Sequence, residues 1–280
     1  MRTSDVAEVA EGVAVARDYY DSEEADGFYS NIWGGEDIHI GLYDGTGDIR
    51  TASRRTVDHM AGKLGPLKGR KVLDLGAGYG GAARVLAGEH AAHVTCLNLS
   101  EVENERNRDL TEAAGLSGRV DVIDGSFDAM PFADESFDIA WSQDAILHAP
   151  DREAVLDEVA RVLKSGGLFI FHDPMQADDL SDLAVLQPIY DRIHLPDLAS
   201  IGFYRKALIA RGFAEVETEV LSHQLGTHYR RIREDMLARK DELGLPQAFV
   251  DRMSEGLGHW VQGAADGNLS WAIMVYRKAE

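Results

Sequence analysis

The spacing of apolar residues changes sharply near residue 70. From there, short apolar runs alternate with amphipathic stretches of about 10 to 15 residues, which is typical of strands alternating with helices. The runs predicted as strands are 71–75, 93–99, 119–125, 136–143 and 168–174, and the helices between them include 82–89, 101–115 and 151–167. This alternation predicts a parallel, doubly wound α/β sheet.

The segments before and after this region follow other patterns. Residues 6–19 and 51–63 have helical spacing, and aromatics mixed with glycines between them, in ADGFYSNIWGGEDIHIGLY, indicate an ordered loop. Towards the end we expect helices over 202–212, 227–243 and 247–262 and strands over 214–222 and 269–277. We therefore divide the chain into an N-terminal helical cap with a substrate loop, 1–65, and a main domain, 66–280, with lid insertions near 175–200 and 225–265.

Composition limits the cellular setting. The 280 residues are 45% hydrophobic, enough for a sizeable core, but no apolar run is long enough to predict a transmembrane helix. The start of the chain has no apolar stretch of the secretory type. Cys96 is the only cysteine and can form no internal disulfide, so we expect a reducing, cytoplasmic location.

The formal charge of −20 is unusual for this length. A surface with that charge repels phosphates, so we expect neither nucleic acid nor a membrane as a partner. Two interpretations stay open: an ordinary soluble acidic enzyme, or adaptation to a salty cytoplasm in which dense negative charge is screened.

A glycine-rich turn, LDLGAGYGG, follows the first predicted strand. Gly76, Gly78 and Gly81 fit the dinucleotide-binding pattern G-x-G-x-x-G, whereas Gly76, Gly78 and Gly80 fit G-x-G-x-G, common in enzymes that use S-adenosylmethionine (SAM). A dinucleotide site also needs an acidic residue about 20 positions on, where this chain has Asn98.

Three further features favour SAM. Asp74 precedes the glycines and could hold a ligand ammonium, Asp124, Ser126 and Phe127 follow the third strand and suit adenine, and a Gly-Gly turn in RVLKSGGLFIF precedes the fifth strand. Together they resemble the class I SAM-dependent methyltransferases. The resemblance implies a doubly wound, mostly parallel seven-stranded sheet, a Rossmann-like fold with helical N-terminal and lid insertions. An NAD-binding or inactive relative is the alternative.

The resemblance can be narrowed further. FYSNIWGGEDIHIGLY, CLNLSEVENERNR, WSQDAILHAPDR and FIFHDPMQADD are similar to segments of the sarcosine/dimethylglycine N-methyltransferases of glycine-betaine synthesis. The resemblance implies that SAM methylates sarcosine and then dimethylglycine. Glycine betaine, the product, is an osmoprotectant, which agrees with a halophile's acidic surface. A small amino acid as substrate and a monomer or homodimer are also expected.

The same resemblance implies roles around the cofactor. Gly76 and Gly78 would approach the methionine part, Asn98 and Leu99 the ribose, Asp124, Ser126 and Phe127 the adenine, and Gln143 the sulfonium, with Asp74 nearby. One position departs from the family pattern: relatives often carry a ribose-binding glutamine where this chain has Glu103, which also forms a capping box with Ser100.

Candidates for the methyl acceptor's site come from two clusters. His148 and His172 lie at strand ends, and with His39 and Tyr20 they are the expected catalytic residues. Aromatic faces suit a methylated ammonium. The expected substrate-binding residues are Trp33, Tyr29, Tyr204, Arg205 for the carboxylate, and Met175, and Tyr43 and Arg192 are further candidates. Ordinary core packing or surface ion pairing is the alternative for each of them.

Two other functions stay open. The acceptor could be another small molecule, a sterol-like, prenyl or sugar hydroxyl, or the chain could be a SAM-binding regulator without turnover. We expect no metal, because methyl transfer to nitrogen requires none and no HExxH-type spacing occurs.

Overall fold

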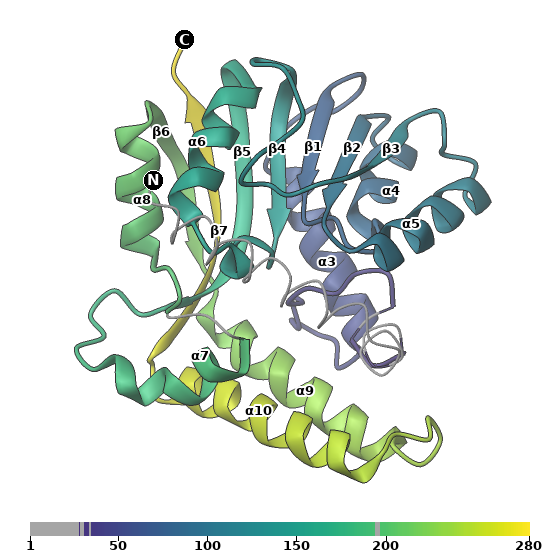
Figure 1. Cartoon of the computed structure of the whole chain (residues 1–280), viewed down its shortest axis with the longest axis vertical. Coiled ribbons are helices and arrows are strands. Elements are labelled where there is room, and N and C mark those ends of the chain that lie inside the picture. Colours follow the sequence, from purple (N-terminus) through teal and green to yellow (C-terminus); the bar gives the residue numbers. More distant parts are fainter. Residues whose placement is uncertain (1–27, 29–30, 34, 194–196) are drawn as a thin grey trace, which may run out of the picture.

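The structure is a computed structural model (Figure 1) and describes residue 28 and residues 31–33, 35–193 and 197–280. The helix predicted over 6–19, together with Tyr20 and Tyr29, lies outside the described residues.

Seven strands form one sheet in the order β3-β2-β1-β4-β5-β7-β6. Their bounds are β1 (Lys71–Leu75), β2 (His93–Asn98), β3 (Val120–Asp124), β4 (Phe137–Gln143), β5 (Leu163–Gln176), β6 (Phe213–Val220) and β7 (Leu269–Lys278). Strands β1 to β5 pair in parallel, and β7 runs antiparallel to both β5 and β6. The predicted mostly parallel, doubly wound sheet is confirmed.

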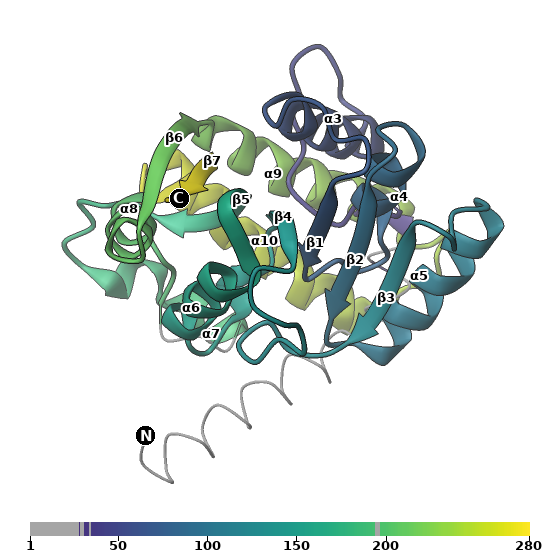
Figure 2. The same ribbon diagram turned by 90° about the horizontal axis from the view of Figure 1, so that it is seen from above.

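Helices cover both faces of this sheet (Figure 2). The helices α3 (Ile49–Gly62), α4 (Gly81–Gly88) and α5 (Glu101–Ala113) lie on one face, and α6 (Arg152–Val162) and α8 (Ile201–Ala210) lie on the other. The central strands are buried from both sides, which explains their nearly continuous apolar sequences. In β1, Val72 packs into the core under α3 and α4, whereas Leu73 and Leu75 pack into the core under α6 and α8.

Side-chain caps fix where the helices begin. The Asp48 carboxylate accepts a hydrogen bond from Thr51 N–H at 2.7 Å, and the Asp151 carboxylate accepts one from Ala154 N–H at 3.0 Å. The predicted cap at Ser100 is also present, because its Oγ accepts from Glu103 N–H at 3.1 Å. Each cap satisfies a backbone donor that the first helical turn leaves free.

One boundary differs from the sequence-based expectation. The helix predicted over 151–167 ends at Val162, and β5 begins at Leu163 instead of residue 168. Leu163 pairs with Phe137 of β4, and Gly166 has a φ of 72°, which a helix does not allow. The backbone of 163–167 therefore joins the sheet, although its residues continue a helical spacing.

A further layer closes one end of the sheet. β5 and β6 both end at the carboxyl edge of the parallel strands, because each runs antiparallel to β7. The helices η2 (Leu183–Leu186) and α7 (Gln187–Ile193) follow β5, and α9 (Ser222–Arg239) and α10 (Gln247–Ala265) follow β6. Figure 1 shows α7, α9 and α10 across this end. That these segments act as a lid, and that 1–65 forms a separate cap, stay predictions.

Burial in the sheet generates a stability prediction. Ile170 of β5 is fully buried and Ile209 of α8 is 55% exposed. We expect Ile170→Ala to lower the free energy of unfolding by about 2–5 kcal/mol, since it leaves a cavity. The same substitution at Ile209 is expected to cost about 0.5 kcal/mol or less. Urea denaturation followed by circular dichroism measures both, and equal losses would contradict this account of the core.

Candidate active site

The glycine turn after β1 forms the floor of the candidate site. Gly76 and Gly78 have φ values of 70° and 50°, in the left-handed region that favours glycine. A Cβ atom at Gly76 would clash with the side chain of Ala145, and one at Gly78 would lie 3.3 Å from Ile38 Cδ1. Glycine at both positions therefore leaves the backbone without a side chain, so that a ligand can approach it closely.

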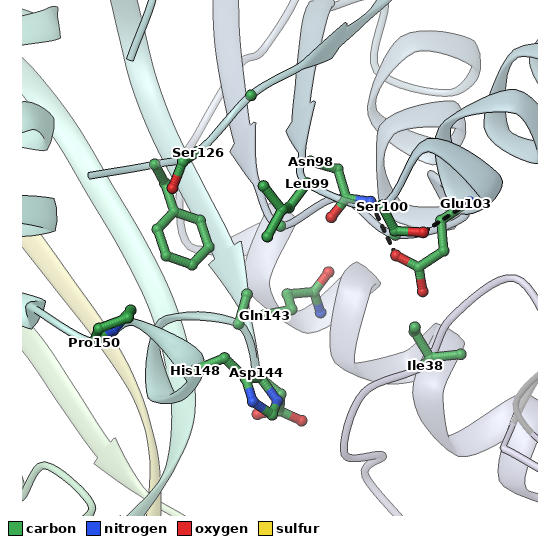
Figure 3. Close-up of a pocket in the computed structure, with 15 residues that line it drawn as sticks. Ile38, Asn98, Leu99, Ser100, Glu103, Ser126, Gln143, Asp144, His148 and Pro150 are labelled. Atoms are coloured by element: carbon green, nitrogen blue, oxygen red, sulfur yellow. Dashed lines mark hydrogen bonds between the residues drawn. The ribbon is translucent and has the colours of Figure 1, made fainter. Parts of the chain in front are cut away.

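A pocket of about 800 Å³, counting its open mouth, lies at the carboxyl edge of β1, β2 and β4 (Figure 3). Such edges are the usual ligand sites of open α/β sheets. The predicted residues that line it are Gly76, Gly78, Asn98, Leu99, Ser126, Phe127, Gln143 and His148. The structure thus brings together most residues expected around the cofactor. Ile38, Asp144 and Ala145 also line it and were not singled out.

Asn98 and Glu103 form a polar pair on one wall of this pocket (Figure 3). Asn98 Nδ2 donates to Glu103 Oε2 at 2.9 Å. Glu103 is also the residue whose backbone N–H is capped by Ser100. The Glu103 carboxylate, at the position that differs from the family pattern, therefore faces the pocket. There it can accept hydrogen bonds from hydroxyl groups.

Two predicted carboxylates lie beside the pocket rather than on its lining. Asp124, at the end of β3, accepts hydrogen bonds from Asn104 Nδ2 at 2.8 Å and from Arg108 Nη2 at 2.7 Å. Asp74 is 3% exposed and makes no hydrogen bond to the described residues. Its burial, together with the nearby Asp37, raises its pKa to about 7.

Asp144 organises the other side of the pocket, although the sequence did not single it out. It follows β4 with a φ of 48°, an unusual conformation for a residue other than glycine. Its Oδ2 accepts from Ile40 N–H at 2.6 Å, and its Oδ1 contacts His172 Nδ1 at 2.7 Å and Trp271 Nε1 at 3.2 Å. Although burial opposes ionisation, the His172 ring and the Ile40 N–H hold the pKa of Asp144 below its ordinary value.

The hydrogen bonds of His172 fix its tautomer. Trp141 Nε1–H donates to Gln143 Oε1 at 2.9 Å, so the Gln143 amide directs its NH₂ group towards His172 Nε2, 3.1 Å away. His172 therefore accepts at Nε2 and donates from Nδ1 to Asp144. Both ring nitrogens are engaged, so this geometry suits a ring that positions its neighbours better than a free base.

His148 and His39 are neutral at physiological pH. Burial and the neighbouring Arg152 lower the pKa of His148 to about 4, against the opposing effect of Asp144. Burial and the adjacent His172 lower the pKa of His39 to about 4 as well. His39 Nδ1–H donates to Ile40 O at 3.2 Å, and its buried Nε2 has no hydrogen-bond partner in the described part of the chain. A neutral imidazole lone pair is therefore available at His39 Nε2.

A further buried histidine, His228 of α9, was not singled out from the sequence. Its Nδ1 accepts from Gly41 N–H at 3.3 Å and from the Tyr43 hydroxyl at 2.8 Å, so the ring proton is on Nε2. Burial lowers its pKa to about 3. No described residue accepts a hydrogen bond from its buried Nε2. Trp33, whose side chain was predicted to bind substrate, packs edge-on against this ring with 5.5 Å between centroids.

Three predicted substrate residues lie away from this cluster. Met175 and the ring of Tyr204 pack in the core under α6 and α8, on the opposite face from His172, because successive strand residues alternate between faces. The Tyr204 hydroxyl donates to Asp173 Oδ2 at 2.6 Å. Arg205 is exposed and pairs with Glu215 of β6 at 2.6 Å. The structure brings none of the three to the pocket, and Tyr20 and Tyr29 cannot be placed.

The described residues form neither a metal site nor a membrane-spanning helix. No group of three or more His, Cys, Asp or Glu side chains is arranged to hold a metal ion. No described helix has both the length and the apolar character that a membrane crossing requires.

Comparisons with known proteins agree with this geometry. A family model described as a methyltransferase domain matches residues 73–171. The sarcosine/dimethylglycine N-methyltransferase of Halorhodospira halochloris is 50% identical, over 96% of this chain and 97% of its own length. The glycine/sarcosine/dimethylglycine N-methyltransferase of Actinopolyspora halophila is 51% identical over 94% of this chain, which spans only 47% of that protein.

A solved structure shows the same similarity in three dimensions. The crystal structure of a proposed sarcosine dimethylglycine methyltransferase from Galdieria sulphuraria superposes with a TM-score of 0.87 at 42% identity. The match covers 92% of this chain and 99% of that one.

The glycine turn gives a prediction with a matched control. Gly78 and Gly115 both have positive φ, and a Cβ atom at Gly115 would meet nothing within 4 Å. We expect alanine at either position to cost about 1–2 kcal/mol of stability. Only Gly78→Ala is expected to weaken binding of S-adenosylhomocysteine, by about tenfold or more, because its Cβ enters the pocket opposite Ile38. Isothermal titration calorimetry measures the affinity of both variants for S-adenosylhomocysteine. If the two affinities are equal, Gly78 does not belong to the site.

Proposed function

Since the chain belongs to the sarcosine/dimethylglycine N-methyltransferase family, we propose that it methylates the nitrogen of sarcosine and then of dimethylglycine, giving glycine betaine. It is a SAM-dependent methyltransferase. The observation that carries the proposal is the similarity to the Halorhodospira halochloris protein over nearly the full length of both chains. The cluster of buried neutral histidines and aromatic rings beside the pocket supports it.

The pocket residues fit the cofactor's chemistry. The bare backbone of Gly76 and Gly78 suits the methionine part, and the Asn98–Glu103 pair suits ribose hydroxyls. Phe127 offers an aromatic face for adenine. When bound, the cofactor supplies an electrophilic methyl group on a sulfonium. Gln143 lies between this pocket and His172, so we place it closest to the transferred methyl.

The acceptor nitrogen must present its lone pair, because it forms the new N–C bond as the S–C bond breaks. At neutral pH the free amino acid carries an ammonium, so a proton has to leave first. The neutral imidazoles of His39 and His148 are the groups we assign to accept it. His172, held through both ring nitrogens between Gln143 and Asp144, orients this side of the pocket.

The product's quaternary ammonium cannot donate a hydrogen bond through nitrogen, so aromatic faces are its best partners. Trp271 lies against His172 with 4.9 Å between ring centroids, and Trp33 and Tyr43 lie against His228. Each such face contributes about 0.5–2 kcal/mol to cation binding. The buried Asp144 carboxylate adds a negative charge on the same side.

The substrate's carboxylate needs donors, and Arg205 is held elsewhere by Glu215. We assign this role to His228, whose Nε2–H is buried without an acceptor among the described residues. A buried donor left unpaired costs about 1–3 kcal/mol, which a carboxylate would recover. A neutral donor also avoids placing a third positive charge next to the ammonium and the sulfonium.

The other acceptors considered above, a sterol-like, prenyl or sugar hydroxyl, are less well supported, because nothing in the polar cluster of Asp144 and three histidines suits an apolar chain. A regulator without turnover would not require the buried, neutral imidazole of His39, whose Nε2 has no hydrogen-bond partner among the described residues. A cytoplasmic location and a monomeric or homodimeric state remain part of the proposal.

An assay of all candidate acceptors tests the reaction. The full chain is incubated with SAM and, separately, with glycine, sarcosine, dimethylglycine and a lipid alcohol, and products are identified by mass. We expect methylation of sarcosine and dimethylglycine. Methylation of the lipid alcohol alone would overturn the substrate assignment but keep the enzyme class, and release of no S-adenosylhomocysteine with any acceptor would favour a regulator.

The role of His228 has its own test. His228→Phe keeps a ring but removes the Nε2–H, and we expect the KM for sarcosine to rise about tenfold or more while the affinity for S-adenosylhomocysteine stays unchanged. Tyr43→Phe, the control, removes the hydrogen bond to His228 and leaves the Nε2–H in place, so its KM is expected to change less than about threefold. Equal effects in both variants would show that His228 only supports the loop.

A further inference from the structure

An arginine is buried beside the glycine turn, outside the cofactor pocket. Arg84 of α4 is 8% exposed and does not belong to the lining of that pocket. A buried guanidinium needs acceptors for its charged N–H groups, because the loss of their hydration is costly. The acceptors of Arg84 come from the glycine turn, from α5 and from the N-terminal loop, so one rigid side chain joins three segments.

The first acceptor is the main chain of the turn itself. Arg84 Nη2 donates to the Tyr79 carbonyl at 2.7 Å. Tyr79 stands between Gly78 and Gly80, whose φ values are 50° and 74°. Glycines leave such a turn many accessible backbone conformations, and a charge-assisted hydrogen bond at its centre narrows them. Arg84 thereby helps to fix the backbone of Gly78, which lines the pocket.

The second acceptor packs on the same turn from α5. Arg84 Nη1 donates to Asn107 Oδ1 at 3.1 Å, and Thr111 Oγ1 donates to the same oxygen at 3.1 Å. A Cβ atom at Gly80 would clash with the Asn107 amide, so this amide lies directly against the turn. Arg84 thus holds the side chain against which Gly80 packs.

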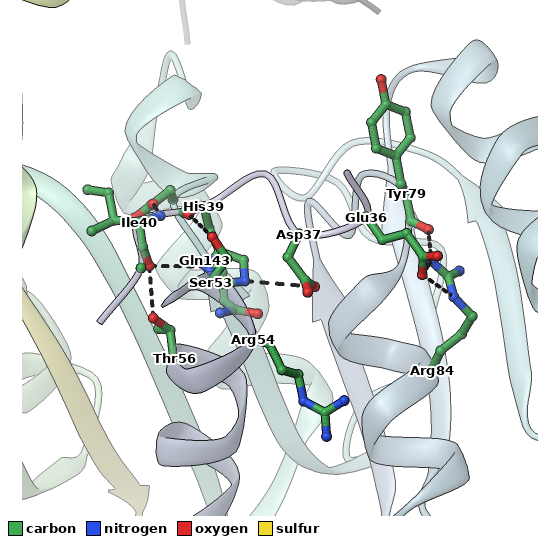
Figure 4. A network of polar contacts seen from close by, with 12 residues as sticks. Glu36, Asp37, His39, Ile40, Ser53, Arg54, Thr56, Tyr79, Arg84 and Gln143 are labelled. Carbon is green, nitrogen blue, oxygen red and sulfur yellow. Dashed lines mark hydrogen bonds and ion pairs between the residues drawn. The ribbon is translucent and has the colours of Figure 1, made fainter. Parts of the chain in front are cut away.

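The third acceptor belongs to the loop that faces the turn across the pocket. Arg84 Nε and Nη2 donate to Glu36 Oε2 at 3.1 and 2.7 Å. Figure 4 shows the guanidinium between the Glu36 carboxylate and the Tyr79 carbonyl. Two residues further on, Ile38 lines the pocket, and its Cδ1 would lie 3.3 Å from a Cβ atom at Gly78. The Glu36 end of this loop is thus bonded to the helix that follows the turn.

The other end of this loop is bonded to α3. Ser53 Oγ donates to His39 O at 3.0 Å, and Thr56 Oγ1 donates to Ile40 O at 2.9 Å (Figure 4). The loop therefore has separate attachments to α3 and α4. Without the guanidinium of Arg84, the residues before Ile38 would lose their ion pair with α4, while those after it would keep their bonds to α3.

We propose that Arg84 is a positioning residue for the cofactor. By bonding the Tyr79 carbonyl and Glu36 at once, it sets the distance between Gly78 and Ile38, the two walls at the place that we assign to the methionine part. This inference rests on the proposed function for that assignment. Glu36 is half-exposed, and such ion pairs are usually weak, but the arginine is already held by the turn, so less side-chain entropy is lost.

A second arginine provides a matched control. The side chain of Arg211, just after α8, is 15% exposed, and it also bonds a main-chain carbonyl, that of Ala207, at 3.0 Å. It pairs with Glu153 and Asp157 of α6, on the opposite face of the sheet, and it does not line the pocket. Lysine at position 84 or 211 keeps the positive charge but loses the planar fork that binds several acceptors. The two substitutions therefore remove similar interactions at different places.

Two ligands report on the pocket. S-adenosylhomocysteine carries the amino-acid part, and 5′-methylthioadenosine lacks it. With the full chain, we expect Arg84→Lys to weaken S-adenosylhomocysteine binding about tenfold or more and 5′-methylthioadenosine binding less than about threefold, since only the first ligand reaches between the two walls. Arg211→Lys is expected to change neither affinity by more than about twofold. Isothermal titration calorimetry measures the affinities, and urea denaturation measures the loss of stability that we expect in both variants.

Glu36→Gln tests the connection to the loop and leaves the buried arginine in place. Alone, it is expected to weaken S-adenosylhomocysteine binding about threefold or more. Combined with Arg84→Lys, it is expected to add less than about twofold, because both substitutions break the same connection. The Glu36 side chain is 52% exposed, so this variant is expected to fold even if Arg84→Lys does not.

The possible results separate the inference from the proposed function. Equal weakening of both ligands by Arg84→Lys would mean that Arg84 only supports the fold. An unchanged affinity for S-adenosylhomocysteine in Arg84→Lys or Glu36→Gln, or fully additive effects in the double variant, would mean that it does not set the distance between the walls. Each of these results overturns the inference. If the unaltered chain binds neither ligand, the proposed function itself fails, which is a different result from a ratio of affinities that does not change.

Discussion

The buried carboxylate of Asp144 is the interaction on which the candidate site depends. It binds Ile40 from the N-terminal loop, His172 from β5 and Trp271 from β7, three segments that are far apart in the sequence. The left-handed backbone of Asp144 costs about 1–3 kcal/mol, which the surrounding hydrogen bonds offset. Removing the carboxyl group would leave buried donors unpaired on all three segments. One anion therefore joins the loop, the sheet and the start of the last strand.

Much of the fold could be predicted from the sequence, because the spacing of apolar residues along a segment follows from which of its side chains are buried. The first strand lies at 71–75 as expected, since Val72, Leu73 and Leu75 are buried on two faces. The end of α6 could not be predicted, because Leu163 and Lys164 continue a helical pattern. Only pairing with Phe137, a contact outside the segment, turns them into a strand.

The cofactor side and the acceptor side of the site also differed in how far the sequence could predict them. The residues expected at the cofactor, such as Gly78, Asn98 and Phe127, lie at or after strand ends, so the order of the strands already brings them to one pocket. His228 could not be found, because the loop that meets it lies 187 residues away in the chain, at Gly41. Met175 and Tyr204 were expected at the site. The two-residue alternation of β5 places Met175 under the other face of the sheet, and Tyr204 belongs to α8, which covers that face.

The distribution of charge explains why the donors of the site are neutral. A methyltransferase acting on an amino acid brings a sulfonium next to a nitrogen that is an ammonium until its proton leaves, so both groups can carry positive charge. An arginine beside them would repel both, and none lines the described cofactor pocket. Histidines kept neutral by burial can donate a hydrogen bond to a carboxylate without adding a positive charge. The acids are placed separately, at Asp144 on the acceptor side and at Asp74 beside the glycine turn. In the proposed arrangement, buried acids face the cationic groups and neutral rings face the carboxylate, as a zwitterionic acceptor requires.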